Sequence, residues 1–286
     1  MDTTIRSPFI VRGLELSLGG TRRGTKALDV LSGVDFLLEP GASLAILGET
    51  GSGKTLLCRS MTRFFHQLPI RQVSGEVLFE ARNLLLESQA SLFRLRTKKV
   101  VHLLQNAGEH FHPRLTIAQH FGLGRKGVGG KAEETDHLMR YLYLVGVVDP
   151  DSFLFDEVYA AELDGMTRQK LMIASALAKE PAVLIADEPT TALDHVSAEQ
   201  LVHALETLKN QHGLAVLLAT GRVRRAEHFG DEVAVLADGT IVESGPPRIL
   251  FERATEKATQ EFAKGTLLSG QGRERLLAPP KRVGDR

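Results

Sequence analysis

The 286-residue sequence predicts an α/β fold, in which a parallel sheet is joined by an N-terminal antiparallel β subdomain and an inserted helical subdomain. Three observations predict this fold. Short apolar runs alternate with helical patterns in the later part of the chain, which is typical of a parallel sheet covered on both faces. Residues 9–18 alternate between apolar and polar, as in a half-buried strand. Residues 105–163 differ in character, because a Gly-rich stretch at 122–130 is followed by a helical pattern at 133–144.

The first part of the chain is expected to supply several strands and one helix. In the first strand, Leu14, Leu16 and Leu18 should share one face. The second strand ends at Pro40-Gly41, which is a turn signal. A basic run at 94–99 is expected to be a solvated helix face or turn before another strand. The expected elements are strands at 9–18, 34–39, 43–47 and 100–104 and a helix at about 54–65.

The later part of the chain is expected to alternate helices with buried strands. The tripeptide Ala237-Asp238-Gly239 lies between two apolar runs and predicts a hairpin. The tail from about residue 269 is rich in Gly, Pro and Arg, a composition that favours disorder. The expected elements are helices at 167–179 and 197–211 and strands at 182–186, 214–219, 232–236 and 240–243.

Composition excludes several classes of protein. Lys plus Arg and Asp plus Glu number 35 each, so net charge gives no reason to expect nucleic acid as a partner. The single cysteine, Cys58, excludes a disulfide framework within the chain and fits a reducing compartment. Residues 1–8 show no signal peptide, and every apolar run is far shorter than the roughly 20 residues of a membrane span. We therefore expect any membrane role to depend on other subunits.

A Gly-rich loop follows the strand at 43–47 and matches the pattern G-x-x-x-x-G-K-[ST]. Glycines let the backbone approach phosphates, and the N–H groups of the loop and of the following helix point at the phosphate oxygens. Lys54 should neutralise the β- and γ-phosphates, and Thr55 should coordinate Mg²⁺. A chance Gly-rich turn is the alternative, which the flanking strand and helix disfavour. The loop consists of Gly48, Glu49, Thr50, Gly51, Ser52, Gly53, Lys54 and Thr55.

Two carboxylates end the apolar strand at 182–186. A strand parallel to the one before the phosphate loop would place both acids near the nucleotide. Asp187 would hold Mg²⁺, directly or through water, and Glu188 would act as the general base toward the attacking water. The alternative is a solvated strand end before the turn at Pro189. The presence of a phosphate loop in the same chain disfavours this alternative.

The order of the remaining motifs resembles the ATPase subunits of ABC transporters. A glutamine, Gln105, lies between the phosphate loop and the sequence Leu163-Asp164-Gly165-Met166-Thr167, and the acidic pair is followed by Ala192-Leu193-Asp194. The chain looks more narrowly like the peptide and nickel importer branch, over about residues 9–260. The narrower resemblance depends on Gln105-Asn106 followed by Phe111-His112-Pro113, on Met172-Ile173-Ala174 and on 185–194.

This resemblance implies a P-loop NTPase core of the RecA-like type that uses ATP and Mg²⁺. It implies that Gln105 touches Mg²⁺ and the attacking water, and that Asp194 lies where two ATPase subunits meet. From the residues alone, Gln105 could be a strand-end polar residue and Asp194 an N-cap. The expected segments are 1–104 (β subdomain and first part of the core), 105–165 (helical subdomain ending in the signature region), 166–250 (second part of the core) and 251–286 (helical extension and tail).

The resemblance also implies an assembly. The expected partners are a second homologous ATPase subunit in a head-to-tail dimer, two integral membrane permease subunits and an extracytoplasmic substrate-binding protein, with no nucleic acid. The chain would be peripheral, at the cytoplasmic face of the inner membrane, and would energise the import of peptides, nickel or metal chelates. The alternatives are an ATP-binding regulatory subunit with negligible hydrolysis and a soluble ABC ATPase outside transport.

The chain departs from the family pattern at the signature, which usually reads L-S-G-G. Asp164 replaces a serine that donates a hydrogen bond to the partner's γ-phosphate, and Met166 replaces a glycine beside Gly165. Asp164 is also a good N-cap for the following helix. Gly221 occupies the place of a histidine that contacts the γ-phosphate, and Leu18 that of an aromatic ring that stacks on adenine. A C-terminal cysteine cluster of some relatives is missing. We therefore expect an asymmetric pair, in which the site facing Asp164 is slow.

His110 and His112 lie two residues apart and raise the question of a metal site. Two histidines without further acidic or cysteine ligands are weak evidence for one. A surface loop is the favoured interpretation.

Overall fold

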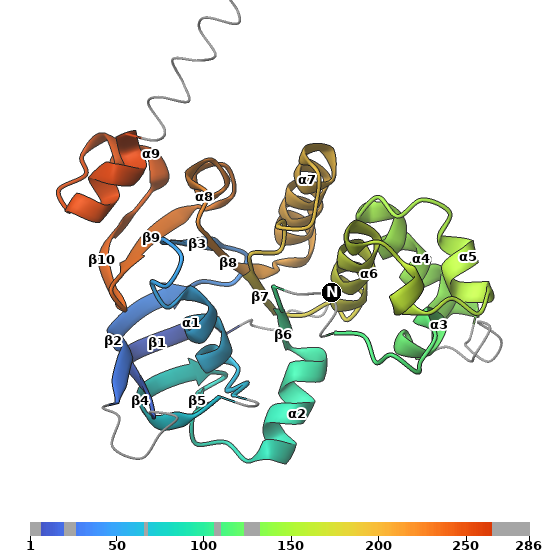
Figure 1. Cartoon of the computed structure of the whole chain (residues 1–286), viewed down its shortest axis with the longest axis horizontal. Coiled ribbons are helices and arrows are strands. Elements are labelled where there is room, and N and C mark those ends of the chain that lie inside the picture. Colours follow the sequence, from blue (N-terminus) through green and yellow to red (C-terminus); the bar gives the residue numbers. More distant parts are fainter. Residues whose placement is uncertain (1–6, 20–26, 66–67, 106–109, 123–131, 265–286) are drawn as a thin grey trace, which may run out of the picture.

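The computed structural model describes residues 7–19, 27–65, 68–105, 110–122 and 132–264. Figure 1 shows two sheets that lie against each other and a group of helices on the far side of the parallel sheet from the N-terminal strands. The Gly-rich stretch at 123–130, most of the loop at 19–24 and the tail from 269 lie outside the described residues.

The N-terminal sheet is antiparallel, as predicted, with the strand order β2-β1-β4-β5. In β1, Val11 and Leu14 are both buried because Gly13, with φ 52°, forms a bulge between them. Leu14 and Leu16 face the core as expected, whereas Leu18 is only half-buried. The strands are β1 (Phe9–Leu18), β2 (Leu28–Leu38), β4 (Ile70–Phe79) and β5 (Arg82–Asn83).

The second sheet is parallel except at one edge, with the strand order β10-β9-β3-β8-β7-β6. Strand β10 pairs antiparallel with β9 through the predicted hairpin, where Asp238 and Gly239 both have positive φ (47° and 77°). Every residue of β3, β7 and β8 is buried, which explains their continuous apolar sequences. The strands are β3 (Ser43–Leu47), β6 (Val100–Leu103), β7 (Val183–Asp187), β8 (Ala215–Thr220), β9 (Glu232–Ala237) and β10 (Thr240–Gly245).

Helix α1 (Lys54–Met61) lies between the two sheets (Figure 1). Its apolar face, with Leu57, Cys58 and Met61 fully buried, joins one core cluster with side chains from both sheets. The helix ends before the predicted limit near Phe65, because Arg63 adopts a positive φ of 51°. Packing against side chains from both sheets therefore holds α1, and with it the residues at its start, in position.

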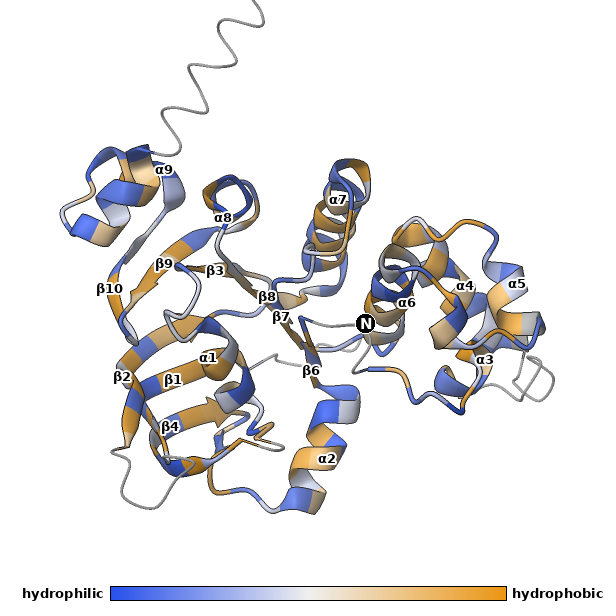
Figure 2. Ribbon diagram, viewed as in Figure 1, coloured by the Kyte–Doolittle hydropathy of each residue, from blue (hydrophilic) through white to orange (hydrophobic). Residues whose placement is uncertain are grey.

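The opposite face of the parallel sheet packs against α6 (Gly165–Leu177) and α7 (His195–His212). Figure 2 shows the expected contrast between apolar strands and helices with mixed faces. Outside the helical subdomain, the structure also has α2 (Gln89–Lys98), α8 (Val223–Phe229) and α9 (Pro247–Glu252), and residues 257–264 are helical. The basic run at 94–99 is the C-terminal part of α2, whose N-cap is Ser88.

The inserted helical subdomain is confirmed as a group of helices beside α6 (Figure 1). Its buried side chains, among them Leu138, Leu142 and Leu154, share one core cluster with α6 and with the outer face of the parallel sheet. The elements are α3 (Ile117–His120), α4 (Ala132–Leu144), α5 (Pro150–Phe155) and the short 3₁₀ helix Ala160–Glu162.

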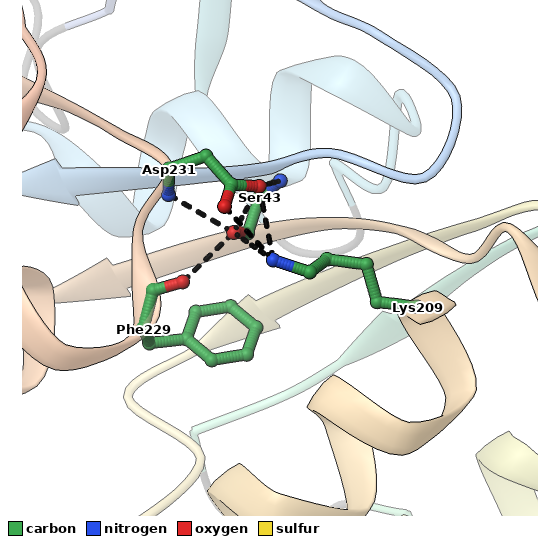
Figure 3. A network of polar contacts seen from close by, with 4 residues as sticks. All are labelled: Ser43, Lys209, Phe229 and Asp231. Carbon is green, nitrogen blue, oxygen red and sulfur yellow. Dashed lines mark hydrogen bonds and ion pairs between the residues drawn. The ribbon is translucent and has the colours of Figure 1, made fainter. Parts of the chain in front are cut away.

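A polar network fastens α7 to the edge of the parallel sheet where β3 begins (Figure 3). Ser43 Oγ donates to the Phe229 carbonyl at 2.8 Å, and Lys209 Nζ donates to Asp231 Oδ1 at 2.9 Å. Asp231 Oδ2 accepts from the Ser43 N–H at 2.8 Å. Burial alone would raise the pKa of Asp231, but hydrogen bonds from Lys209 and Ser43 outweigh it and lower that pKa.

Candidate nucleotide-binding site

The phosphate loop connects β3 to α1 at the carboxyl edge of the parallel sheet, where ligands bind in folds of this kind. Gly51 and Gly53 have φ values of 90° and 107°, which residues with a Cβ rarely adopt. Gly53 is the N-cap of α1 and no side chain caps that helix. The N–H groups of its first turn therefore stay available to an anion.

Two glycines of the loop are required by close neighbours. A Cβ on Gly48 would lie 2.5 Å from Ser52 Oγ and 2.6 Å from the Leu236 carbonyl oxygen. A Cβ on Gly53 would lie 3.0 Å from Leu31 Cδ2. By contrast, a Cβ on Gly51 would meet nothing within 4 Å, so that side of the loop is open.

Lys54 bends back over the loop that precedes it. Its Nζ donates to the carbonyl oxygens of Gly48 at 2.7 Å and Glu49 at 2.8 Å. Burial lowers the pKa of Lys54, although the charges of Glu188 and Asp187 act in the opposite direction. The ammonium group thus lies inside the loop, close to both carboxylates.

Asp187 ends β7 and is almost fully buried, with 2% of its surface exposed. Burial raises its pKa, and a hydrogen bond from the Thr55 side chain opposes this rise. Among the described residues its Oδ1 has no hydrogen-bond partner, although the atom is buried. An unpaired buried carboxylate oxygen beside a threonine hydroxyl is what a small divalent cation needs. The residues present therefore fit Mg²⁺.

Glu188 follows with an unusual backbone conformation, φ 47°. Its N–H donates to the Ala219 carbonyl at 3.0 Å, and its Oε1 accepts from the Gly221 N–H at 2.7 Å. Its Oε2 lies 3.5 Å from Thr220 Oγ1. The end of β8 thus holds the carboxylate of Glu188 in place, and Gly221 lies beside it.

Gln105 is exposed and lies two residues beyond the end of β6. Strand β6 pairs in parallel with β7, with Leu103 opposite Ala186. Because the two strands run in the same direction, Gln105 emerges at the sheet edge that also carries Asp187 and Glu188.

The remaining predicted site residues form a second group at the start of α6 and α7. Asp164 is exposed and caps α6: its Oδ1 accepts from the Thr167 N–H at 2.9 Å and its Oδ2 from Thr167 Oγ1 at 2.7 Å. The hydrogen bonds from Thr167 lower the pKa of Asp164. Gly165 is the first residue of α6 and is also exposed.

Asp194 caps α7 in the same way, by accepting from the Ser197 N–H at 2.7 Å. Met166 Sδ lies 3.7 Å from Ser197 Oγ, which brings the starts of the two helices together. The N-cap interpretations of Asp164 and Asp194 are therefore confirmed. Figure 1 shows α6 separated from α1 by the strands of the parallel sheet, so the signature residues lie apart from the phosphate loop of their own chain.

Gln169, which follows the signature-like sequence, is not among the predicted site residues. It is 1% exposed, and its Nε2 donates to the Pro189 carbonyl at 2.9 Å. This bond ties α6 to the loop after Glu188. The only signal was an amide side chain on the apolar face of a predicted helix, where a buried polar group needs a partner.

His110 and His112 belong to no group of three or more His, Cys, Asp or Glu side chains arranged to hold a metal ion in the described segments. His112 is exposed, as expected for a surface loop, but His110 is half-buried and its pKa is lowered by burial to about 4. In the same segments, no helix combines the length and apolar character that crossing a membrane requires.

Comparisons with known proteins agree with this geometry. A family model described as ABC transporter matches residues 31–191. A probable peptide ABC transporter ATP-binding protein of Sinorhizobium fredii is 33% identical over 269 residues, which cover 93% of this chain and 79% of the relative. A nickel import ATP-binding protein of Rhodospirillum rubrum is 35% identical over 247 residues, covering 85% of this chain and 90% of the relative.

A solved structure shows the same fold. It is an ATP-binding cassette, determined as a dimer in a post-hydrolysis state with ADP and Pi. The TM-score is 0.70 at 22% sequence identity, and the match covers 84% of this chain and 99% of the other. The predicted P-loop NTPase core with its two subdomains is thereby confirmed.

Proposed function

The chain belongs to the ABC transporter family of ATP-binding proteins, and we propose that it is the ATP-hydrolysing subunit of an importer. The observation that carries this proposal is the unpaired Oδ1 of Asp187, buried beside Thr55 at the foot of an open phosphate loop. The names of these two relatives favour peptides or nickel as the cargo, and a metal chelate is a further candidate.

Each residue of the site has a role in this proposal. The backbone N–H groups of residues 48–55 hold the phosphates, and Lys54 exchanges its two carbonyl partners for phosphate oxygens. Thr55, Asp187 and Gln105 would hold Mg²⁺, which supplies charge neutralisation on the β- and γ-phosphates when bound. Glu188 orients the attacking water and accepts its proton. The hydrogen bond from the Gly221 N–H already holds its carboxylate in position.

The second group of site residues acts on a neighbouring subunit. Asp164, Gly165, Met166 and Asp194 would face the nucleotide held by the phosphate loop of a second homologous ATPase subunit. The separation of α6 from α1 within one chain supports this, because the signature cannot serve its own phosphate loop in the arrangement of Figure 1. Segment 105–165 would dock on cytoplasmic loops of the permease, which consists of two membrane subunits, and an extracytoplasmic binding protein would deliver the cargo. The chain would be peripheral, on the cytoplasmic face of the inner membrane.

We further propose that the two sites of the dimer are unequal. Both oxygens of Asp164 accept hydrogen bonds from Thr167, so this side chain has a capping role and no donor to offer a phosphate. Its negative charge would repel the partner's nucleotide. A regulatory subunit that binds ATP with negligible hydrolysis is the second candidate, which the absence of a side chain at Gly221 favours.

The first test is nucleotide binding by the purified chain. We expect calorimetry to detect magnesium-dependent ATP binding, and Lys54→Ala to weaken it by about tenfold or more, because a charge-assisted contact is lost. Lys98→Ala is the matched control, since this lysine is exposed on α2. If neither the chain alone nor the chain with its sister subunit binds magnesium nucleotide, the proposal is wrong. Co-purification of two permeases separates a transporter from a soluble ATPase.

A further inference from the structure

Position 221 leaves space beside the carboxylate of Glu188. A Cβ built on Gly221 would lie 3.4 Å from the Gly48 carbonyl oxygen and 3.6 Å from Glu188 Oε1, which is room for a side chain. The backbone N–H of Gly221 already donates to Glu188. Position 221 therefore offers no further hydrogen-bond donor to a phosphate at this point.

A cationic side chain comes from the next turn of the chain. Helix α8 begins at Val223, directly after Gly221 and Arg222, and it carries Arg225. Arg225 is half-buried, and its Nη1 is buried without a hydrogen-bond partner among the residues that the structure describes. A guanidinium is charged at every physiological pH, and a buried charged donor without a partner is costly. This cost suggests a ligand that completes the site.

The backbone places α8 near the catalytic edge, because the helix begins two residues after Gly221, whose N–H donates to Glu188. Burial and the charge of Arg222 lower the pKa of Arg225, while the charge of Glu188 acts in the opposite direction. The start of α8 is also fastened to this edge. The Arg222 N–H donates to Thr220 Oγ1 at 3.1 Å, and the Arg225 N–H donates to the Arg222 carbonyl at 3.0 Å.

We propose that Arg225 binds the terminal phosphate of a nucleoside triphosphate, and so distinguishes a triphosphate from a diphosphate. The proposal rests on the nucleotide site proposed above. Glu188 acts on the water that attacks the terminal phosphate, so a cation beside Glu188 lies at the terminal-phosphate end of the nucleotide. Arg225 has an unused buried donor there, whereas Arg222 is exposed. A diphosphate would end before it reaches this donor.

The test compares two affinities of the full-length chain, for a non-hydrolysable ATP analogue and for ADP, each with magnesium. Loss of a charge-assisted hydrogen bond should weaken binding of the analogue about tenfold in Arg225→Gln, while the affinity for ADP changes less than twofold. Arg225→Lys, which keeps the charge, should retain most of the preference. Arg224→Gln is the matched control, because Arg224 is exposed on the same turn of α8, and it should change neither affinity.

Two results would overturn the inference: an unchanged ratio of the two affinities in Arg225→Gln, or an equal loss of both. If Arg225→Gln does not fold, Arg225→Met keeps the aliphatic stem and takes its place, with the same two outcomes. A wild-type chain that binds neither nucleotide would instead contradict the proposed nucleotide site. Failure of the site and failure of this inference are therefore distinct results.

Discussion

The backbone N–H of Gly221 donates a 2.7 Å hydrogen bond to Oε1 of Glu188. The bond joins the residue after β8 to the residue after β7, and the two strands pair in parallel from Val183 opposite Ala215 to Asp187 opposite Ala219. Glu188 itself keeps a positive φ of 47°, a conformation that the surrounding contacts must maintain. The carboxylate is therefore oriented before any nucleotide binds, and the adjacent position without a side chain is a suitable place for an experiment.

Gly221→His should raise ATP turnover. The Cβ of the new residue fits, because its nearest neighbours would be 3.4 Å and 3.6 Å away, and the imidazole would add a donor beside the γ-phosphate. We expect an increase of about tenfold, measured as phosphate release by the assembled pair. Gly221→Ala fills the same space without a donor and should stay within twofold of the wild type. If the histidine variant does not turn over faster, our interpretation of position 221 is wrong.

Asp187→Asn should stabilise the free protein, although it should weaken ATP binding by removing a magnesium ligand. Burial raises the pKa of Asp187, so its charged form is disfavoured in the folded state, and its Oδ1 has no partner among the described residues. Replacing the carboxylate by an amide should increase the free energy of unfolding by about 1 kcal/mol at pH 7. Thermal unfolding without nucleotide measures this change, and a lower melting temperature would contradict it.

The same variant tests the metal ligand. In the wild type, removal of magnesium with EDTA should weaken ATP binding, because the phosphate charges are then less completely neutralised. In Asp187→Asn the affinity should be weak and nearly independent of EDTA. Magnesium dependence that persists undiminished in the variant would show that Asp187 is not among the residues that hold the ion.

The sequence predicted the catalytic half of the fold better than the N-terminal sheet. Strands β3, β7 and β8 are buried on both faces, so each is a continuous apolar run. Such a run can be identified as a strand from the sequence without knowing which strands lie beside it. Strand β4 was missed because its alternation breaks at Gly75, with φ 94°. A Cβ on Gly75 would clash with the backbone of Gly13 in β1, so this glycine answers a tertiary contact that the local sequence does not reveal.

Some residues of the candidate site could also be predicted from local sequence, whereas others depend on how distant elements pack. The phosphate loop and the acidic pair could each be recognised from local sequence, since each directly follows a buried apolar strand. Their meeting depends on the parallel pairing of β3 with β8 and of β8 with β7. The bond between Gln169 and Pro189 and the buried donor of Arg225 depend on how α6 and α8 pack on the sheet.

Helices α3 and α5 have 4 and 6 residues, too few to show a helical period in the sequence.

Asp231→Asn should destabilise the fold at neutral pH. Asp231 accepts hydrogen bonds from Lys209 and Ser43, and Lys209 is only 13% exposed, so the variant leaves a poorly hydrated ammonium without its counter-charge. We expect the free energy of unfolding to fall by about 1 kcal/mol in urea titrations at pH 7, because Asp231 is 53% exposed and water screens its charge. Asp136→Asn, at an exposed position of α4, is the control and should change stability little.

The effect of Asp231→Asn should also depend on pH. The folded-state pKa of Asp231 is lowered, so its contribution to stability is present above the unfolded pKa, near 3.9, and is lost as pH falls through the folded value. The wild type and the variant should therefore converge in stability in acid. A difference that stays constant between pH 7 and pH 3 would show that the charge of Asp231 is not responsible.

Asp164→Ser should accelerate hydrolysis at one site of the assembled pair and leave the other unchanged. Serine keeps the N-cap of α6, because its hydroxyl can also accept from the Thr167 N–H, so stability should be preserved. It removes the negative charge and provides a donor for the partner's γ-phosphate. Inactivating the phosphate-loop lysine of one subunit at a time measures each site alone.

In the wild type we expect the site that faces Asp164 to be at least about tenfold slower than the site built on this chain's own phosphate loop. Asp164→Ser should remove most of that difference. Asp164→Ala separates the two causes, because it removes the charge without adding a donor and also loses the helix cap, at about 1 kcal/mol. Equal rates at the two sites of the wild-type pair would contradict the proposed asymmetry, since Asp164 would then be harmless to the nucleotide it faces.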